Sequence, residues 1–159
     1  KLTVDGDSPT DTGSGATVNH VYSTPGSYTA TLRVVDNGGM SAAASATVTV
    51  GTPLVAMSVN DIAMSRTLTS TRSRATAVVK VLNSAGQPVS GVSVSARWSG
   101  ATSATVSGTT GTAGTVTFSS AQTTARTGSF TFTVTAASKT GHSYVPASNV
   151  ETSDSITVR

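Results

Sequence analysis

The 159-residue chain is long enough for one ordinary domain or two small ones, and its richness in Thr and Val favours strands because β-branched side chains suit a pleated sheet. It has no cysteine, which excludes a disulfide framework, a thiolate metal ligand and a thiol nucleophile. The formal net charge is +3, but the basic residues are scattered and not interleaved with aromatic ones, so no nucleic-acid partner is expected.

Residues 1–50 are expected to form strands joined by tight turns. Apolar and polar residues alternate in "YTATLRVV" (28–35) and in "AAASATVTV" (42–50), as expected for strands with one apolar face. Asn37-Gly38 between them predicts a hairpin turn, because both residues tolerate positive φ. Two further strands are expected earlier in the chain, over "KLTV" (1–4) and "ATVNHVY" (16–22).

The polar stretch "DGDSPTD" is the candidate metal site. Its acidic residues Asp5, Asp7 and Asp11 place three carboxylates in one loop, and carboxylate oxygens are the ligands that Ca²⁺ prefers. The spacing is not that of an EF-hand, and Asx-turns explain aspartates in such a loop without any ion. Both explanations stay open: no cofactor is required, and Ca²⁺ is the ion that the loop would hold.

Gly51 and Pro53 interrupt the alternation, which predicts a first domain over residues 1–51, a linker over 52–57 and a second domain over 58–159. The second domain carries the positive charge, since residues 53–159 hold eight Lys/Arg against three Asp/Glu. Its short alternating segments, separated by Gly-rich turns, predict a β-sandwich of about seven strands. The residues expected to face inward are Ile62, Met64, Leu68, Ala75, Ala77, Val79, Val81, Val92, Val94, Ala96, Trp98, Val116, Phe118, Phe130, Phe132, Val134, Ala136, Ile156 and Val158.

The first domain resembles a known family. "HVYSTPGSYTATLRVVDNGG…ATVTV" carries the pattern PG-x-Y-x-x-x-L-x-V-x-D-x-x-G, and over residues 16–50 it resembles the C-terminal half of a PKD domain, an Ig-like module. The "WDFGDG" that usually precedes this pattern is replaced by "KLTVDGDSPTDTGSG", and the family's leading strands are absent. The resemblance therefore implies an all-β chain of two Ig-like β-sandwich domains in tandem, the first one incomplete.

The second domain resembles the bacterial Ig-like (Big-1-like) domains of adhesins and of secreted peptidases. The resemblance rests on "G-x-PV-x-G-x-x-V" and "G-x-T…G-x-V-x-F" within "VLNSAGQPVSGVSVSARWSG…SGTTGTAGTVTFSS". Together the two resemblances imply a non-catalytic accessory region of a secreted bacterial hydrolase, with a peptidase favoured, that acts as a spacer, a stabiliser or a polymer-docking module. The alternative is a segment of a bacterial surface adhesin or stalk protein.

The expected partners follow from these resemblances. They are the catalytic domain of the parent protein and an insoluble protein or polysaccharide substrate, and the expected location is secreted or at the cell surface. No membrane span is expected, because no apolar run approaches the roughly 18 residues that one requires.

No enzymatic site is expected. His20 in "ATVNHVY" is expected to be hydrogen-bonded inside its sandwich, and His142 in "SKTGHSYVP" to be a solvated loop residue, so the two would lie in different domains. No nucleophile elbow and no HExxH motif accompanies them. Glu151 and Asp154 are the nearest approach to paired acids, and solvated charges or turn caps explain them better than glycosidase chemistry.

Three aromatic residues are assigned from their positions. Trp98 shares a face with apolar residues and is expected in the core rather than on a carbohydrate-stacking surface. Tyr28 follows the Pro25-Gly26 turn and is expected to hydrogen-bond the backbone as a corner tyrosine. Tyr144 in "HSYVP" is the remaining candidate for an exposed binding contact.

The first domain supplies only about half of the strands of a sandwich, whose two sheets cover each other's inner faces. Exposed apolar faces and open strand edges invite pairing with other chains. We therefore expect a fragment of a longer protein, cut within the PKD-like domain. Its first part should pair with strands of another chain or of a retained upstream peptide, or pack on the second domain.

Overall fold

The computed structural model describes residues 2–5, 11–13, 17 and 19–159. The regular secondary structure of these residues consists of strands and one short 3-10 helix, so the predicted all-β class is confirmed. The chain divides into two compact units, Lys1–Pro53 and Leu54–Arg159. No helix in the described part of the chain is long and apolar enough to cross a membrane.

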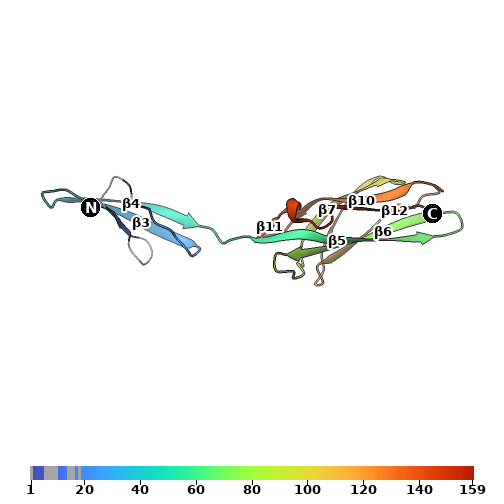
Figure 1. Ribbon diagram of the computed structural model, residues 1–159, viewed down its shortest axis with the longest axis horizontal. Helices are drawn as coiled ribbons and strands as arrows, with labels where there is room; N and C mark the ends of the chain where they lie inside the picture. The colour runs from blue at the N-terminus through green and yellow to red at the C-terminus, as the bar shows by residue number, and fades with distance from the viewer. Residues whose placement is uncertain (1, 6–10, 14–16, 18) are drawn as a thin grey trace. The chain divides into compact units, whose positions relative to one another are not determined.

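The first unit contains one antiparallel sheet with the strand order β2-β1-β3-β4. Figure 1 shows β3 and β4 side by side. Its longest ladder joins β3 to β4 and runs from the pair Gly26↔Val50 to the pair Val35↔Ser41. The strands are β1 (Leu2–Asp5), β2 (Asp11–Gly13), β3 (Gly26–Val35) and β4 (Ser41–Val50).

The prediction of a strand over residues 16–22 is wrong for the residues that the structure describes there, because residues 17 and 19–22 form a loop. β3 already has β1 and β4 as neighbours, so it offers no free edge to this segment. The Tyr22 ring contacts those of His20 and Tyr28, at centroid distances of 4.5 and 4.6 Å. The hydroxyl of Tyr28 donates to the carbonyl oxygen of Thr24 at 2.7 Å, which confirms the predicted corner tyrosine.

The turn between β3 and β4 differs from the prediction. Neither Asn37 nor Gly38 has positive φ; the left-handed residue is Gly39, at +83°. The carboxylate of Asp36 accepts hydrogen bonds from the backbone N–H groups of Gly38 (2.9 Å) and Met40 (2.8 Å). Asp36 thereby stabilises a three-residue turn that ends in a left-handed glycine, the next commonest hairpin connection after two-residue turns.

The apolar face of the first unit has little cover among the described residues. Residue 17 and residues 19–53 of this unit include no buried residue, and the side chains of Leu32 and Val34 are 37% and 44% exposed. Tyr28, Val48 and Val50 are half-buried. The predicted pairing with another chain, an upstream peptide or the second unit stays a prediction.

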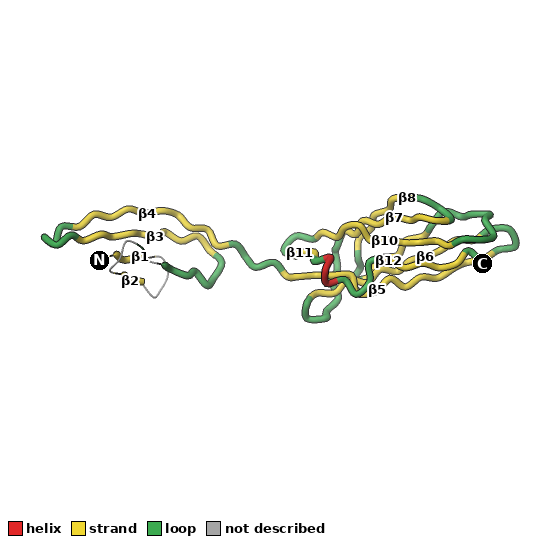
Figure 2. The backbone as a smooth tube through the Cα atoms, turned by 45° about the horizontal axis from the view of Figure 1, so that its top comes forward, coloured by secondary structure: helices red, strands yellow, loops and turns green. Residues whose placement is uncertain are grey.

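The second unit is a sandwich of two four-stranded sheets (Figure 2). One sheet has the order β12-β10-β7-β8 and the other has the order β11-β5-β6-β9. The sandwich has eight strands where the alternation predicted about seven, and β8 and β11 are absent from that alternation. The elements are β5 (Val55–Leu68), β6 (Ser73–Asn83), β7 (Ser93–Gly100), β8 (Ala104–Thr109), β9 (Thr115–Ser119), β10 (Ser129–Ser138), β11 (His142–Tyr144), η1 (Pro146–Ser148) and β12 (Ser153–Thr157).

The core lies between these two sheets, and the predicted burial of Trp98 is confirmed. Trp98 is fully buried, and its ring lies 4.7 Å from that of Phe132. The inward residues of β6 are equally buried, as their alternation predicts. Most predicted core residues are buried, including Ile62, Ala75, Ala77, Val79, Val81, Val92, Val94, Ala96, Phe118, Phe130, Val134 and Val158, while Met64, Val116 and Ile156 pack against the core half-buried.

Two β-bulges change which residues face inward, because an extra residue shifts the two-residue period by one. In β10 the register shifts between Val134 and Ala136, so Ala137 is buried and the predicted Ala136 is exposed. A second bulge in β5 lies just before Ile62. Leu68, also predicted to face inward, is 47% exposed because β5 ends there beside a turn.

Candidate functional site

The predicted Ca²⁺ loop lies partly outside the described residues. Asp5 ends β1 and Asp11 begins β2, and the pairing Val4↔Asp11 places the two strand ends side by side. Asp7 lies outside the described residues. Ca²⁺ binding by Asp5, Asp7 and Asp11 therefore stays a prediction. Among the residues that the structure describes, no other group of His, Asp and Glu side chains could hold a metal ion.

The two histidines lie in different units. His20 is half-buried in the loop before β3, where its ring meets the Tyr22 ring edge-on. His142 was expected in a solvated loop, but it begins β11 and is half-buried. Its Nδ1 lies 3.3 Å from the carbonyl oxygen of Thr140. β11 is a strand because it pairs in parallel with the start of β5.

Tyr144, the predicted binding residue, ends β11 and packs half-buried against the core. Its hydroxyl accepts a hydrogen bond from the Asn149 side-chain amide at 2.8 Å. The carbonyl oxygen of that amide accepts from the backbone N–H of Val59 at 2.9 Å. Tyr144 thus positions a side chain that covers the edge of β5, and a role in binding stays a prediction.

Glu151 has a structural role that the sequence did not indicate. Its carboxylate accepts a hydrogen bond from the backbone N–H of Ile62 at 2.7 Å, and its side chain is half-buried. This N–H lies on the open edge of β5, just after the bulge. The interpretation of Glu151 as a solvated charge or turn cap is wrong, because it satisfies a donor of a strand distant in the sequence. Asp154 accepts only from the adjacent Ser155 N–H.

We expect Glu151→Ala to lower the free energy of unfolding by about 1.5–3 kcal/mol, because it removes a charged acceptor and leaves the Ile62 N–H unpaired. Glu151→Gln, which keeps an acceptor oxygen, should lose less. Urea denaturation measures both. Asp154→Ala is the matched control, since it removes the same charge and only a local hydrogen bond. Equal losses for Glu151→Ala and Asp154→Ala would contradict the edge-capping role.

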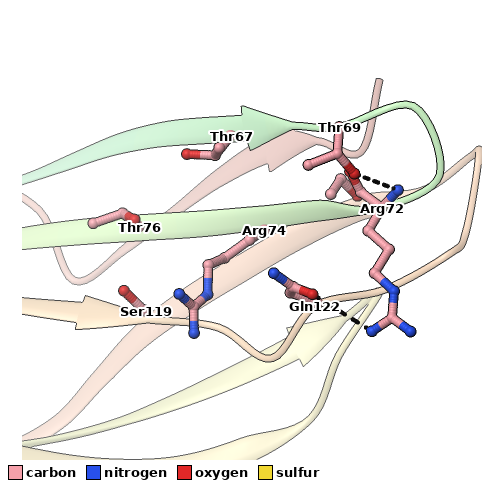
Figure 3. Close-up of a pocket in the computed structure, with 8 residues that line it drawn as sticks. Thr67, Thr69, Arg72, Arg74, Thr76, Ser119 and Gln122 are labelled. Atoms are coloured by element: carbon pink, nitrogen blue, oxygen red, sulfur yellow. Dashed lines mark hydrogen bonds between the residues drawn. The ribbon is translucent and has the colours of Figure 1, made fainter.

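A polar pocket lies on the outer face of the sheet that contains β5 and β6 (Figure 3). Its volume is about 190 Å³. Because Ala75 and Ala77 face the core, their neighbours Arg74 and Thr76 face outward into this pocket. Residues from β5, β6, β9 and the segment after β9 line it, among them Thr67, Arg72, Ser73, Arg74, Ser119 and Gln122.

Arg74 on β6 and Arg72, which immediately precedes that strand, extend toward the segment that follows β9, with Gln122 between them (Figure 3). The Nε of Arg74 donates to the carbonyl oxygen of Ser120 at 3.0 Å. The Nη1 of Arg72 lies 3.4 Å from the Gln122 side-chain oxygen, a long hydrogen bond. No sequence motif predicts this pocket. The sequence feature that could have pointed to it is its charge pattern, because residues 62–150 contain seven Lys/Arg and no Asp/Glu.

These features describe an all-β chain of Ig-like modules, in which the described residues assemble no catalytic group. Residues 4–50, which are 47 of the 159, match the PKD domain family. The match confirms the predicted PKD resemblance. It begins at residue 4, whereas the resemblance was predicted from residue 16 on. PKD domains are generally non-catalytic modules and occur in extracellular proteins. No curated protein and no solved structure matches the chain.

Proposed function

We propose that this chain is a non-catalytic accessory region of a secreted bacterial hydrolase, with a peptidase as the favoured parent. It spaces the catalytic domain or docks it on an insoluble protein or polysaccharide. The match of residues 4–50 to the PKD domain family carries the proposal. The geometry supports it, since His20 and His142 lie in separate units and the acid Glu151 is engaged with the backbone of β5.

A second candidate, a segment of a bacterial adhesin or stalk, rests on the Big-1-like motif around Pro88. This motif forms a turn in which the Gln87 N–H donates to the Asn83 side chain at 2.9 Å and the Val89 N–H donates to Val81 at 3.1 Å. The turn returns the chain to β6, a structural role that suits either candidate. The full gene product separates them: a catalytic domain supports the first, and tandem repeats with an anchor support the second.

We expect the chain to release no product from casein, collagen or chitin, because His20 and His142 lie in separate units and neither is accompanied by a nucleophile elbow or an HExxH motif. Turnover that disappears in His20→Ala or His142→Ala would overturn the non-catalytic assignment.

Retention on insoluble collagen, chitin or cell-wall material, compared with an unrelated β-sandwich protein, tests the docking role. Retention no greater than that of the control leaves only the spacer role.

A further inference from the structure

The pocket at the β5–β6 end of the second unit is built mainly from hydrogen-bond donors. Thr67, Thr76 and Ser119 contribute hydroxyl groups, and Arg72 and Arg74 contribute guanidinium groups. Arg74 uses only its Nε for a protein contact, and Arg72 uses only one nitrogen, so most of their N–H groups have no acceptor among the described residues. Guanidinium groups with free N–H pairs bind oxyanions in a two-point geometry.

No acidic side chain competes for these arginines. The acids of the second unit are three, and none lines the pocket. Asp61 pairs in register with Lys80, toward the opposite end of β6 from Arg74. Glu151 binds the Ile62 N–H, and Asp154 lies in the other sheet. The local field at the pocket is therefore positive and attracts anions.

We propose that this pocket binds an acidic sugar unit of an anionic polysaccharide, with Arg72 and Arg74 holding its carboxylate or sulfate group. The inference rests on the docking role proposed above and names its ligand class. A volume of about 190 Å³ is below the 300–1,000 Å³ typical of sites that enclose a whole small ligand, which suits one charged unit of a longer chain.

The lining favours a sugar over a nucleic acid. Hydroxyl groups and the Gln122 amide match the hydroxyl groups of a saccharide. Proteins that bind single-stranded nucleic acids stack the bases on aromatic side chains, and no aromatic side chain lines the pocket. The Trp98 and Phe132 rings, for example, are buried in the core.

Affinity electrophoresis of the full chain tests the proposal, with gels that contain polygalacturonate, dextran sulfate or uncharged dextran. We expect at least one acidic polymer, and not dextran, to retard the protein. Polygalacturonate presents carboxylates and dextran sulfate presents sulfates, so the two gels distinguish the acidic group. Arg72→Gln/Arg74→Gln should weaken binding roughly tenfold, because charge-assisted hydrogen bonds are lost.

Lys80→Gln/Arg97→Gln is the matched control, since it removes the same charge from exposed or half-exposed positions away from the pocket. An equal loss in this control, or a wild-type chain that neither acidic polymer retards, would overturn the proposal. Retention on an insoluble polymer that persists unchanged in the arginine variant would also overturn it, while leaving the docking role intact.

Two single variants distinguish a loss of binding from a loss of stability. Arg74 contacts the backbone of Ser120, whereas Arg72 contacts only a side chain, so Arg72→Gln should weaken binding without altering the thermal midpoint. Ser73→Ala is a control for the pocket, because Ser73 lies on the inward face of β6 with Ala75 and is 1% exposed; it should leave binding unchanged and the free protein as stable or slightly more stable. Unchanged affinity in Arg72→Gln would contradict the site.

Discussion

Replacement of Trp98 by alanine should lower the free energy of unfolding of the second unit by about 3–5 kcal/mol, the range expected for loss of a large aromatic side chain from a core. Trp98 is fully buried on β7, and its ring contacts that of Phe132 on β10. The Phe132 ring lies 5.3 Å from that of Phe118 on β9, in the opposite sheet. Removing Trp98 therefore opens a cavity where the two sheets meet.

Urea denaturation followed by circular dichroism measures this loss, because Trp98 is the only tryptophan and its fluorescence disappears with it. Trp98→Phe is the control. The Nε1 of Trp98 has no hydrogen-bond partner among the described residues, so the change to phenylalanine reduces the side-chain volume without removing a hydrogen bond. Its cost should be clearly smaller. Similar losses for the two variants would show that filling this part of the core matters little.

Replacement of Gly100 by alanine should cost about 3 kcal/mol or more, because two separate penalties combine. The residue has a φ of +86°, which disfavours any side chain. An added Cβ would also overlap the carbonyl oxygen of Ser129, which accepts the backbone N–H of Ala101 at 2.8 Å. The strand end of β7 and the start of β10 would have to separate.

Gly86→Ala isolates the penalty of the left-handed backbone conformation. Gly86 has a φ of +75°, but a Cβ there would meet no atom within 4 Å. It should lose only the roughly 1–2 kcal/mol of the left-handed conformation. Urea denaturation of both variants gives the difference, and equal losses would contradict the predicted backbone clash at Gly100.

The sequence predicted best those strands in which the alternation of apolar and polar residues alone decides which face points inward. In β6 and β7, every second residue is apolar without interruption, so the inward faces through Val79 and Trp98 follow directly from the two-residue period. The period failed at the β10 bulge, since nothing near Ala136 distinguishes a residue that pairs from one that is bypassed.

The sites were harder to predict because their contacts join distant residues. Glu151 and Ile62 lie 89 residues apart, and no local pattern marks a carboxylate that will accept a strand's N–H. Arg72 and Arg74 are only two residues apart in the sequence, but the pocket exists only because β9 and Gln122 come to lie beside them. The absence of any acid between residues 62 and 150 is the signal in the sequence that could have directed attention to this surface.

The residues that cover the edge of β5 come late in the sequence, and they therefore determine when the second unit can finish folding. β5 is its first strand, yet its edge is covered by β11, Asn149 and Glu151, and the Arg66 guanidinium donates to the carbonyl oxygen of Thr157 at 2.8 Å. These contacts give the fold a high contact order, which slows folding. A chain synthesised from its N-terminus therefore holds β5 unfinished until nearly all of the unit has been made.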